Sequence, residues 1–243
     1  MQQQQPVALI TGASRGLGLE IARLFARRGM PLVVTARGRA ALEAAADELR
    51  EVTEVAALPG DVADRHHAEH LVRLGLERFG RIDVLVNSAS AIGPSPMPAL
   101  ETYPLGAFDE VFRVNVGAPL HLAQLVLPGM RARANGVIVN VTSDAAVQAY
   151  PGWGGYGASK AALEQLSRVL AAELEGSGIR LYVVDPGDMN TQMHREAEPG
   201  VDLSDLPGPE LSAPGFLHLV EEETAPFGRF EAQKLAPAIP GGR

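Results

Sequence analysis

Short, unbroken apolar runs recur along the chain and predict buried β-strands. They lie at residues 7–10, 32–34, 55–58, 84–86, 137–141 and 181–184, and most are rich in Val and Ile. Runs without polar alternation are typical of strands that are covered on both faces, as in a parallel sheet flanked by helices. A weaker last strand is expected at 229–232.

Segments with helical spacing separate these runs. Apolar residues three or four positions apart begin at Leu17 and recur from Leu163 to Leu174, which gives each segment one apolar face. Strand and helix therefore alternate, which predicts an α/β fold. From 187 to 215 the sequence becomes rich in Pro, Gly and acidic residues. Because long irregular segments inside a domain often bind ligands, we expect 187–215 to form a lid over a substrate.

Composition narrows the choice of function. The 243 residues include 21 basic and 29 acidic ones, a net charge of −8, which argues against a nucleic-acid partner. No apolar run approaches the roughly 20 residues that span a bilayer, so no membrane is expected either. Cysteine is absent, which removes thiol nucleophiles and zinc–thiolate sites. We expect a cytoplasmic protein that acts on a small molecule.

A glycine-rich turn, residues 11–18, follows the first predicted strand and precedes a helix. It reads Thr-Gly-Ala-Ser-Arg-Gly-Leu-Gly. Unpaired backbone N–H groups and the positive end of a helix dipole meet at such a turn, which suits a phosphate. We therefore expect it to bind the pyrophosphate of a dinucleotide through Gly12, Ser14, Arg15, Gly16, Leu17 and Gly18.

The same turn also fits the G-x-S-x-G pattern of serine hydrolases, with Ser14 as the nucleophile. Asp185 and His194 follow it in the order that hydrolases use. However, the turn lies on the first strand, so no earlier strand can supply the usual oxyanion loop. The hydrolase is kept as a third hypothesis.

The end of the second strand bears on the choice of nucleotide. A free ribose 2′-hydroxyl usually meets Asp or Glu there, whereas a 2′-phosphate needs positive charge. The strand ends in Thr-Ala-Arg, with Arg37 and no acid at that position. Arg37 and Arg15 offer two guanidinium groups, whose planar donors match phosphate oxygens. The sequence therefore favours NADP(H), the alternative being two solvated surface arginines.

An acid–base group follows the fifth predicted strand. Tyr156 and Lys160 are four positions apart on a helix and so share a face. An ammonium beside a phenol stabilises the phenolate, so a lowered pKa is expected for Tyr156. Ser143 ends the strand at the edge where open α/β sheets bind ligands, and its hydroxyl can lie beside the phenol.

Together these residues resemble the short-chain dehydrogenase/reductase family, over roughly residues 6 to 191. The matching positions stand in the family's order and spacing: Thr11-Gly12-x-x-x-Gly16-x-Gly18, Asp61, Asn87-x-Ala89, Asn115, Ser143, Tyr156-x-x-x-Lys160 and Pro186-Gly187. The resemblance implies one Rossmann-type, doubly wound domain over 1–243, with a parallel sheet of about seven strands and helices on both faces.

The resemblance also implies roles for four side chains. Tyr156 would be the general acid and base, and Ser143 would orient the substrate oxygen. Lys160 would bind the nicotinamide ribose and lower the pKa of Tyr156. Asn115 would hold a water that links Lys160 to solvent.

Further cofactor contacts are implied outside the glycine turn. Asp61 and Val62 would flank the adenine ring, and Asn87 and Ala89 would shape the turn after the fourth strand. After the sixth strand, the implied contacts are Pro186, Gly187 and Thr191, and the Thr191 hydroxyl would meet the nicotinamide carboxamide.

Two features depart from, or add to, this pattern. The family commonly reads Asn-Asn-Ala-Gly where this chain has Ser88 and Ser90 in the second and fourth positions, so Ser90 adds a side chain where backbone usually approaches the cofactor. His66 and His70 have a spacing that can hold a metal, but no third ligand is evident, and they are assigned to a polar outer face with His67. No metal site is expected.

The leading hypothesis is an NADP(H)-dependent carbonyl reductase, reversible as an alcohol dehydrogenase, that acts on a small or medium, partly apolar substrate. A homodimer or homotetramer, formed through the helices after Asn115 and Tyr156, is implied by the resemblance. The second hypothesis is a sensor or scaffold that binds NADPH without turnover. The complete Ser, Tyr and Lys set argues against it, because a binding module needs no activated phenol.

Overall fold

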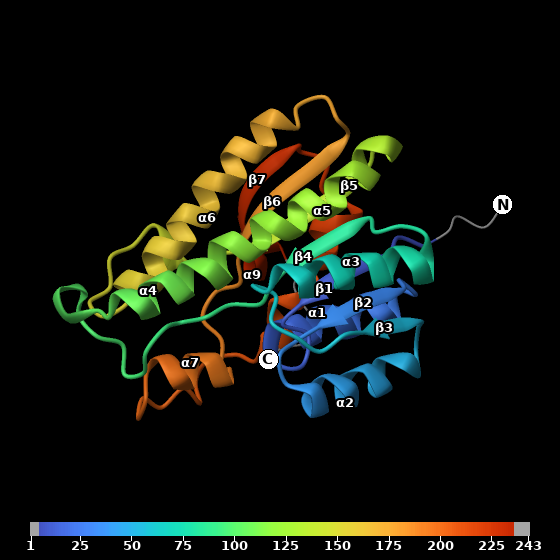
Figure 1. Ribbon diagram of the computed structural model, residues 1–243. Coiled ribbons are helices and arrows are strands. Elements are labelled where there is room, and N and C mark those ends of the chain that lie inside the picture. The colour runs from blue at the N-terminus through green and yellow to red at the C-terminus, as the bar shows by residue number, and fades with distance from the viewer. Residues whose placement is uncertain (1–4, 236–243) are drawn as a thin grey trace.

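The computed structural model describes residues 5–235, which contain a parallel sheet of seven strands. The strands are β1 (Ala8–Thr11), β2 (Leu32–Thr35), β3 (Val55–Ala57), β4 (Val84–Asn87), β5 (Gly136–Val141), β6 (Ile179–Asp185) and β7 (Phe227–Glu231). Their order is β3-β2-β1-β4-β5-β6-β7 (Figure 1). From β1 the chain first adds strands on one side, β2 and then β3, and it then adds β4 to β7 on the other side of β1. Doubly wound sheets bind ligands at this switch point between β1 and β4.

Helices cover both faces of the sheet. One face carries α1 (Gly16–Arg27), α2 (Arg39–Arg50) and α8 (Ala213–Glu221). The other carries α3 (Arg65–Phe79), α5 (Ala118–Arg133) and α6 (Gly154–Glu173), with α4 (Leu105–Phe112) packed against α6. A π-helical turn, η2 (Arg113–Gly117), joins α4 to α5. The shorter elements are α7 (Gln192–Ala197), α9 (Ala232–Leu235) and three 3₁₀ turns, η1 (Leu100–Thr102), η3 (Asp144–Ala146) and η4 (Pro209–Leu211).

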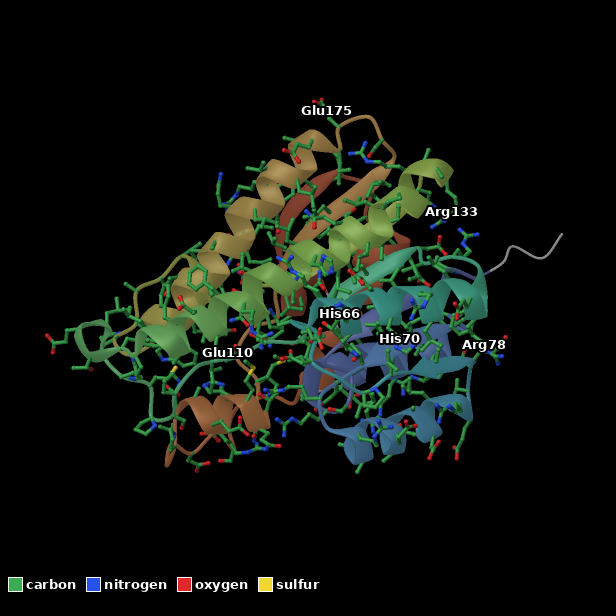
Figure 2. All side chains as sticks on the ribbon, in the orientation of Figure 1. His66, His70, Arg78, Glu110, Arg133 and Glu175 are labelled. Atoms are coloured by element: carbon green, nitrogen blue, oxygen red, sulfur yellow. The ribbon has the colours of Figure 1, made fainter. Side chains whose placement is uncertain are left out.

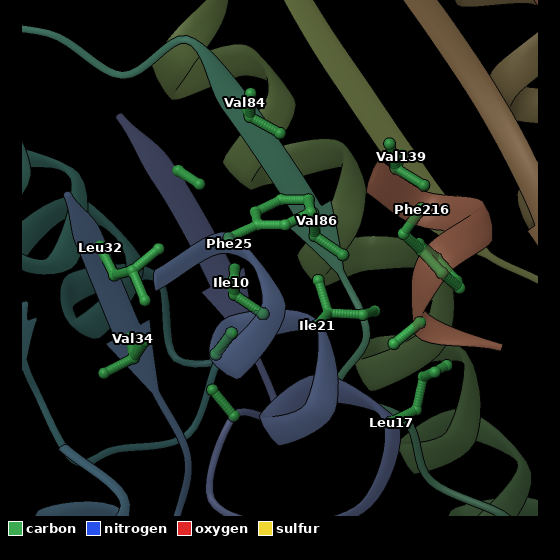
Figure 3. Close-up of a cluster of buried hydrophobic side chains, with 14 of the residues drawn as sticks. Ile10, Leu17, Ile21, Phe25, Leu32, Val34, Val84, Val86, Val139 and Phe216 are labelled. Carbon is green, nitrogen blue, oxygen red and sulfur yellow. The ribbon is translucent and has the colours of Figure 1, made fainter. Parts of the chain in front are cut away.

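Two apolar clusters, one on each face, hold these layers together. In the cluster under α1, the side chains of Ile21, Phe25 and Phe216 are fully buried against β1 and β4 (Figure 3). Each such side chain contributes about 1.5–3 kcal/mol relative to exposure. The opposite cluster packs α3 and α5 onto the sheet. Burial on both faces explains why the strands read as unbroken apolar runs.

The predicted fold class is confirmed. All seven expected strands are present within a few residues of their predicted ends, and the last is Phe227–Glu231 where 229–232 was expected. Helices begin at the glycine turn and just before Tyr156, as the apolar spacing indicated. None of the helices in residues 5–235 is long and apolar enough to cross a bilayer.

The turns after β1 and β4 are locked together by backbone contacts. Thr11 Oγ1 accepts hydrogen bonds from the N–H groups of Ser88 and Ala89, both at 3.0 Å. Gly12 has φ +71°, and a Cβ there would lie 3.0 Å from the backbone of Ala89. A Cβ on Gly18 would lie 2.5 Å from the carbonyl oxygen of Gly12. Two glycines attributed above to phosphate binding are thus required for packing of the chain on itself.

Gly18→Ala tests this packing. The added methyl would meet a backbone oxygen that cannot move without displacing the turn, so we expect a loss of about 1–3 kcal/mol in the free energy of unfolding, measured with urea. Gly106→Ala is the control, because a Cβ there has no heavy atom within 4 Å and alanine favours the helix. Equal stability of Gly18→Ala and the wild type would contradict the close approach.

Candidate functional site

The candidate site lies at the edge of the sheet where β5 and β6 end and α6 begins. A cavity of about 450 Å³ is present there, and the side chains of Ser143 and Tyr156 line it. Much of the remaining wall comes from the segment after β6, which includes α7. In Figure 1, α7 projects at the lower left, away from the helices that cover the sheet. The segment 187–215 therefore borders the cavity, and its role as a lid remains a prediction.

Tyr156 and Lys160 lie one turn apart near the start of α6. Lys160 is 2% exposed, and its Nζ donates a hydrogen bond to the carbonyl oxygen of Val141 at 2.9 Å. Nζ lies 5.4 Å from the centroid of the Tyr156 ring. The first turn of α6 fits closely under η3, because a Cβ on Gly157 would lie 2.6 Å from the carbonyl oxygen of Ala145. The predicted pairing of Tyr156 with Lys160 on one helix face is present in the structure.

Burial dominates the pKa values of this pair. It raises the pKa of the Tyr156 phenol above its usual value, against the lowering effect of the neighbouring Ser143 and Ser90 hydroxyls. Burial also lowers the pKa of Lys160 to about 7. The direction for Tyr156 is opposite to the one expected from the sequence, because loss of water around the phenol outweighs the favourable neighbours.

Ser143 is held between a carboxylate and the backbone. Its Oγ donates to Oδ1 of Asp144 at 2.9 Å and accepts from the N–H of Ala145 at 3.2 Å. Oδ2 of Asp144 accepts from the hydroxyl of Tyr150 at 2.6 Å, and this hydrogen bond raises the pKa of Tyr150 to about 12. The adjacent Thr142 turns the other way, and its hydroxyl donates to Glu164 at 2.8 Å.

Asn115 lies in η2, and its side chain is fully hydrogen-bonded. Oδ1 accepts from the N–H of Ala91 at 2.8 Å and from the hydroxyl of Ser90 at 3.0 Å. Nδ2 donates to the carbonyl oxygen of Ala91 at 2.8 Å and to Oγ of Ser159 at 2.9 Å. Ser90, which stands where the resembled family has glycine, is therefore part of the connection between the β4 turn and η2.

A buried ion-pair network, which the sequence did not indicate, contacts the backbone of Ser143. Glu164 is 1% exposed and accepts from Arg229 at 2.9 Å and from Arg168 at 3.0 Å. Arg229 also donates to the carbonyl oxygen of Ser143 at 3.3 Å and lies 3.5 Å from Asp185. The only sequence signal for this network was the position of Glu164, four residues after Lys160 on the same helix. Arg229 lies 86 residues after Ser143, so no local pattern connects the two.

The glycine turn offers a cradle for a phosphate. Arg15 is the N-cap residue of α1 and makes no side-chain hydrogen bond to the helix start, and no acid stands in the first turn. Gly16 has φ +57°, and the nearest atom to a Cβ there would be 3.9 Å away, on Thr191. The first N–H groups of α1 therefore lack a side-chain cap, as a helix that binds an anion requires. These residues fit the pyrophosphate of a dinucleotide.

The two arginines expected to meet a 2′-phosphate differ in their contacts. Arg37 is exposed at the end of β2 and forms no ion pair within the described part of the chain. Arg15 is also exposed, and its guanidinium donates to Oε1 of Gln192 at the start of α7. Asp61, assigned to the adenine ring, accepts from the guanidinium of Arg113 in η2 at 2.8 Å.

The other expected cofactor residues lie around the same edge. Val62 is buried beside Asp61. Nδ2 of Asn87 donates to Oδ1 of Asn140 at 2.8 Å, and Oδ1 of Asn87 is buried without a hydrogen-bond partner among residues 5–235. The positions after β6 also lie at this edge: Pro186 and Gly187 line the cavity, and Thr191 lines it while capping α7. The structure thus brings the predicted residues of all segments together, and their roles remain proposals.

The hydrolase hypothesis gains no support from the geometry. Both ring nitrogens of His194 lie within hydrogen-bonding distance of other groups, the carbonyl oxygen of Met189 at 3.2 Å and Glu198 at 3.3 Å. Asp185 accepts from the N–H of Gly187 at 2.9 Å. The base and acid that Ser14 would need are thus engaged elsewhere.

The histidines of α3 divide into two sets. His66 and His70, labelled in Figure 2, are exposed on α3. The expectation that His67 lies with them was wrong, because its Nε2 is 2.8 Å from Oγ1 of Thr35 and its ring packs against Gly60. Among residues 5–235, no group of three or more His, Cys, Asp or Glu side chains could hold a metal.

Comparison with known proteins gives a consistent result. Residues 6–202 match the family model described as short chain dehydrogenase. The chain is 39% identical over 196 residues to 2-(R)-hydroxypropyl-CoM dehydrogenase from Xanthobacter autotrophicus, which covers 77% of this chain and 76% of that protein. It is 36% identical over 198 residues to a rhamnolipid-biosynthesis 3-oxoacyl-[acyl-carrier-protein] reductase from Pseudomonas aeruginosa, covering 78% and 75%.

Solved structures agree with this match. An alcohol dehydrogenase from the archaeon Thermococcus sibiricus, complexed with 5-hydroxy-NADP, superposes with a TM-score of 0.83 at 29% identity. The match covers 94% of this chain and 96% of that one. The likeness therefore includes the segment after β6 as well as the sheet.

Lys160→Met tests the burial of the ammonium. The pKa of Lys160 is about 7 in the folded protein and about 10.4 in an unfolded chain, so between these values only the unfolded chain binds the proton. The free energy of unfolding of the wild type should then rise with pH across this window, and the variant should lack that rise. We expect the variant to gain a few kcal/mol at pH 6–7 and progressively less toward pH 10, measured by urea unfolding.

Lys234→Met is the matched control, because that side chain is 74% exposed. A pH-independent difference between Lys160→Met and the wild type would contradict the burial of a titrating lysine.

Proposed function

The chain belongs to the short-chain dehydrogenase family, and from this premise we propose that it transfers a hydride between NADP(H) and a carbonyl or alcohol substrate. The observation that carries the proposal is the cavity itself. The hydroxyls of Ser143 and Tyr156 face it, Lys160 lies behind the phenol, and the uncapped start of α1 lies at the same sheet edge. When bound, the nicotinamide supplies or accepts the hydride.

In this proposal Tyr156 gives a proton to the substrate oxygen during carbonyl reduction and takes it back during alcohol oxidation. Its raised pKa keeps the phenol protonated at neutral pH, which is the form that reduction needs. Oxidation needs the phenolate. A positively charged nicotinamide, together with the ammonium of Lys160, would favour that form.

Ser143 would hold the substrate oxygen beside the phenol. A serine hydroxyl has one proton to donate, and here that proton points to Asp144. A carbonyl oxygen would therefore compete with Asp144 for it, and so would the oxygen of an alcohol, because the alcohol gives its own proton to Tyr156. This arrangement supports an active site that accepts both forms of the substrate.

Asn115 would act through its backbone. Both lone pairs of its amide oxygen and both amide hydrogens are used by protein groups, so a water that links Lys160 to solvent would bind the main chain of η2. A π-helical turn breaks the regular hydrogen-bond ladder and often occurs at functional sites, which supports this assignment.

Preference for NADP(H) over NAD(H) is proposed from charge. Arg37 is exposed where the adenosine ribose would lie, and β2 ends without an acid. The relationship to an alcohol dehydrogenase complexed with an NADP derivative supports the same choice. The sensor hypothesis is less well supported, because it leaves the Ser143, Tyr156 and Lys160 set without a use.

Tyr156→Phe tests the proton transfer. Removing the phenolic hydroxyl should lower kcat for the reduction of any accepted carbonyl by at least about 100-fold, while NADPH binding, followed by cofactor fluorescence, should change little. Tyr103→Phe is the control, since the Tyr103 hydroxyl is buried without a partner in the described structure. Undiminished turnover in Tyr156→Phe would rule out the assigned role.

Arg37→Ala tests the cofactor preference. Loss of a charge-assisted contact with the 2′-phosphate should weaken NADPH binding by about 10- to 100-fold and NADH binding by less than about 3-fold. Dissociation constants from cofactor fluorescence report the difference without turnover. Arg73→Ala, on the exposed side of α3, is the control. Equal effects on both cofactors would refute the preference.

A further inference from the structure

The substrate cavity places one carboxylate directly beside the group that holds the substrate oxygen. Oδ1 of Asp144 lies 2.9 Å from Oγ of Ser143, and the carboxylate lines the same cavity. Asp144 forms no ion pair with Lys, Arg or His in residues 5–235, and its partners are the hydroxyls of Ser143 and Tyr150. A negative charge without a cationic partner therefore lies next to the reacting centre.

The carboxylates that line the cavity give it a negative charge. Asp185, Asp188, Glu198, Asp202 and Asp205 line it together with Asp144, and the described lining contains no Lys or Arg. Asp185 is neutralised in part by Arg229, 3.5 Å away, and Glu198 lies 3.3 Å from Nε2 of His194. The field reaches the phenol, because Asp185 and Asp144 both raise the pKa of Tyr156.

Part of the cavity wall is apolar. Met189, Met193 and Leu206 line the cavity, and the ring of Trp153 lies 5.7 Å from that of Tyr156 in an edge-to-face arrangement. Methionine adapts to apolar ligands of varied shape, and an indole face also attracts a cation. The cavity therefore combines an apolar surface with a fixed negative charge near the position of the substrate oxygen.

We propose that Asp144 is a specificity-determining residue that selects substrates with a protonated amine on the carbon next to the reacting one. Vicinal amino alcohols and the corresponding α-aminoketones are this class. In such a substrate the oxygen would meet the Ser143 hydroxyl and the nitrogen on the next carbon would meet the Asp144 carboxylate. The apolar remainder would pack against Met189 and Met193. The inference rests on the proposed function, since the catalytic hydroxyls mark the cavity as the substrate site.

Four alcohols on one phenyl scaffold test the selection: 2-amino-1-phenylethanol, 1-phenyl-1,2-ethanediol, 1-phenylethanol and mandelate. They carry a cationic, a neutral polar, an apolar and an anionic group next to the same carbinol carbon. Oxidation by the full chain is followed with saturating NADP⁺ and with NAD⁺ at pH 7.5. We expect kcat/KM for the amino alcohol to exceed that for 1-phenylethanol by at least about 10-fold, with mandelate lowest.

Asp144→Asn removes the charge and keeps the shape. It should lower kcat/KM for the amino alcohol by about 10- to 100-fold more than it lowers kcat/KM for 1-phenylethanol, mainly through KM. Asp109→Asn, which removes an exposed carboxylate on α4, should leave every value unchanged. An equal loss for all four alcohols in Asp144→Asn would mean that Asp144 only positions Ser143, and would overturn the selection.

Calorimetry separates this inference from the proposed function. Affinity for 2-amino-1-phenylethanol is measured in the Tyr156→Phe chain with NADP⁺, with and without Asp144→Asn. If Asp144→Asn abolishes binding of the amino alcohol, the selection by Asp144 is supported, whether or not any alcohol is oxidised. A failure to oxidise any of the alcohols would count against the proposed reaction alone. Tyr156-dependent oxidation without preference for the amine, or no binding of the amine, overturns the selection.

Discussion

The common direction of the strands is the constraint on which the site depends. Because the sheet is parallel, β1, β4, β5 and β6 end at one edge, and residues far apart in the sequence meet there. The Thr11 hydroxyl ties the ends of β1 and β4 together, because its Oγ1 accepts hydrogen bonds from the N–H groups of Ser88 and Ala89. Gly12 and Gly18 permit this contact because any side chain would strike backbone atoms. The proposed phosphate cradle and the proposed catalytic hydroxyls therefore share one rigid support.

Polar side chains at this edge lose water, so each needs a partner within the protein. The first turns of α6 show the result: Lys160 donates to the Val141 carbonyl, and Glu164 accepts from Arg229. Arg229 also reaches the carbonyl oxygen of Ser143, which connects β5 and β7 through one guanidinium. Breaking such a buried pair by removing one partner is costly, so this network keeps Ser143 in one position.

Local patterns in the sequence were sufficient for the fold, and the side chains that they proposed for the site lie at one edge of the sheet. Unbroken apolar runs located the strands, the glycine turn followed the first of them, and the four-residue spacing placed Lys160 beside Tyr156. The misses all depend on contacts between distant segments. The inward position of His67 follows from Thr35 on β2, and the raised pKa of Tyr156 follows from burial that no spacing reveals. Arg229 was missed for the same reason.

The protonation of Tyr156 connects the buried charges with the proposed specificity. Burial keeps the phenol protonated, and the carboxylates of Asp144 and Asp185 add to that effect. A substrate ammonium at Asp144 would offset one of these charges, and a cation near a phenol favours the phenolate. The same contact would then strengthen binding and ease removal of the alcohol proton. Neutral substrates would leave the charge of Asp144 uncompensated, so they would lose both advantages.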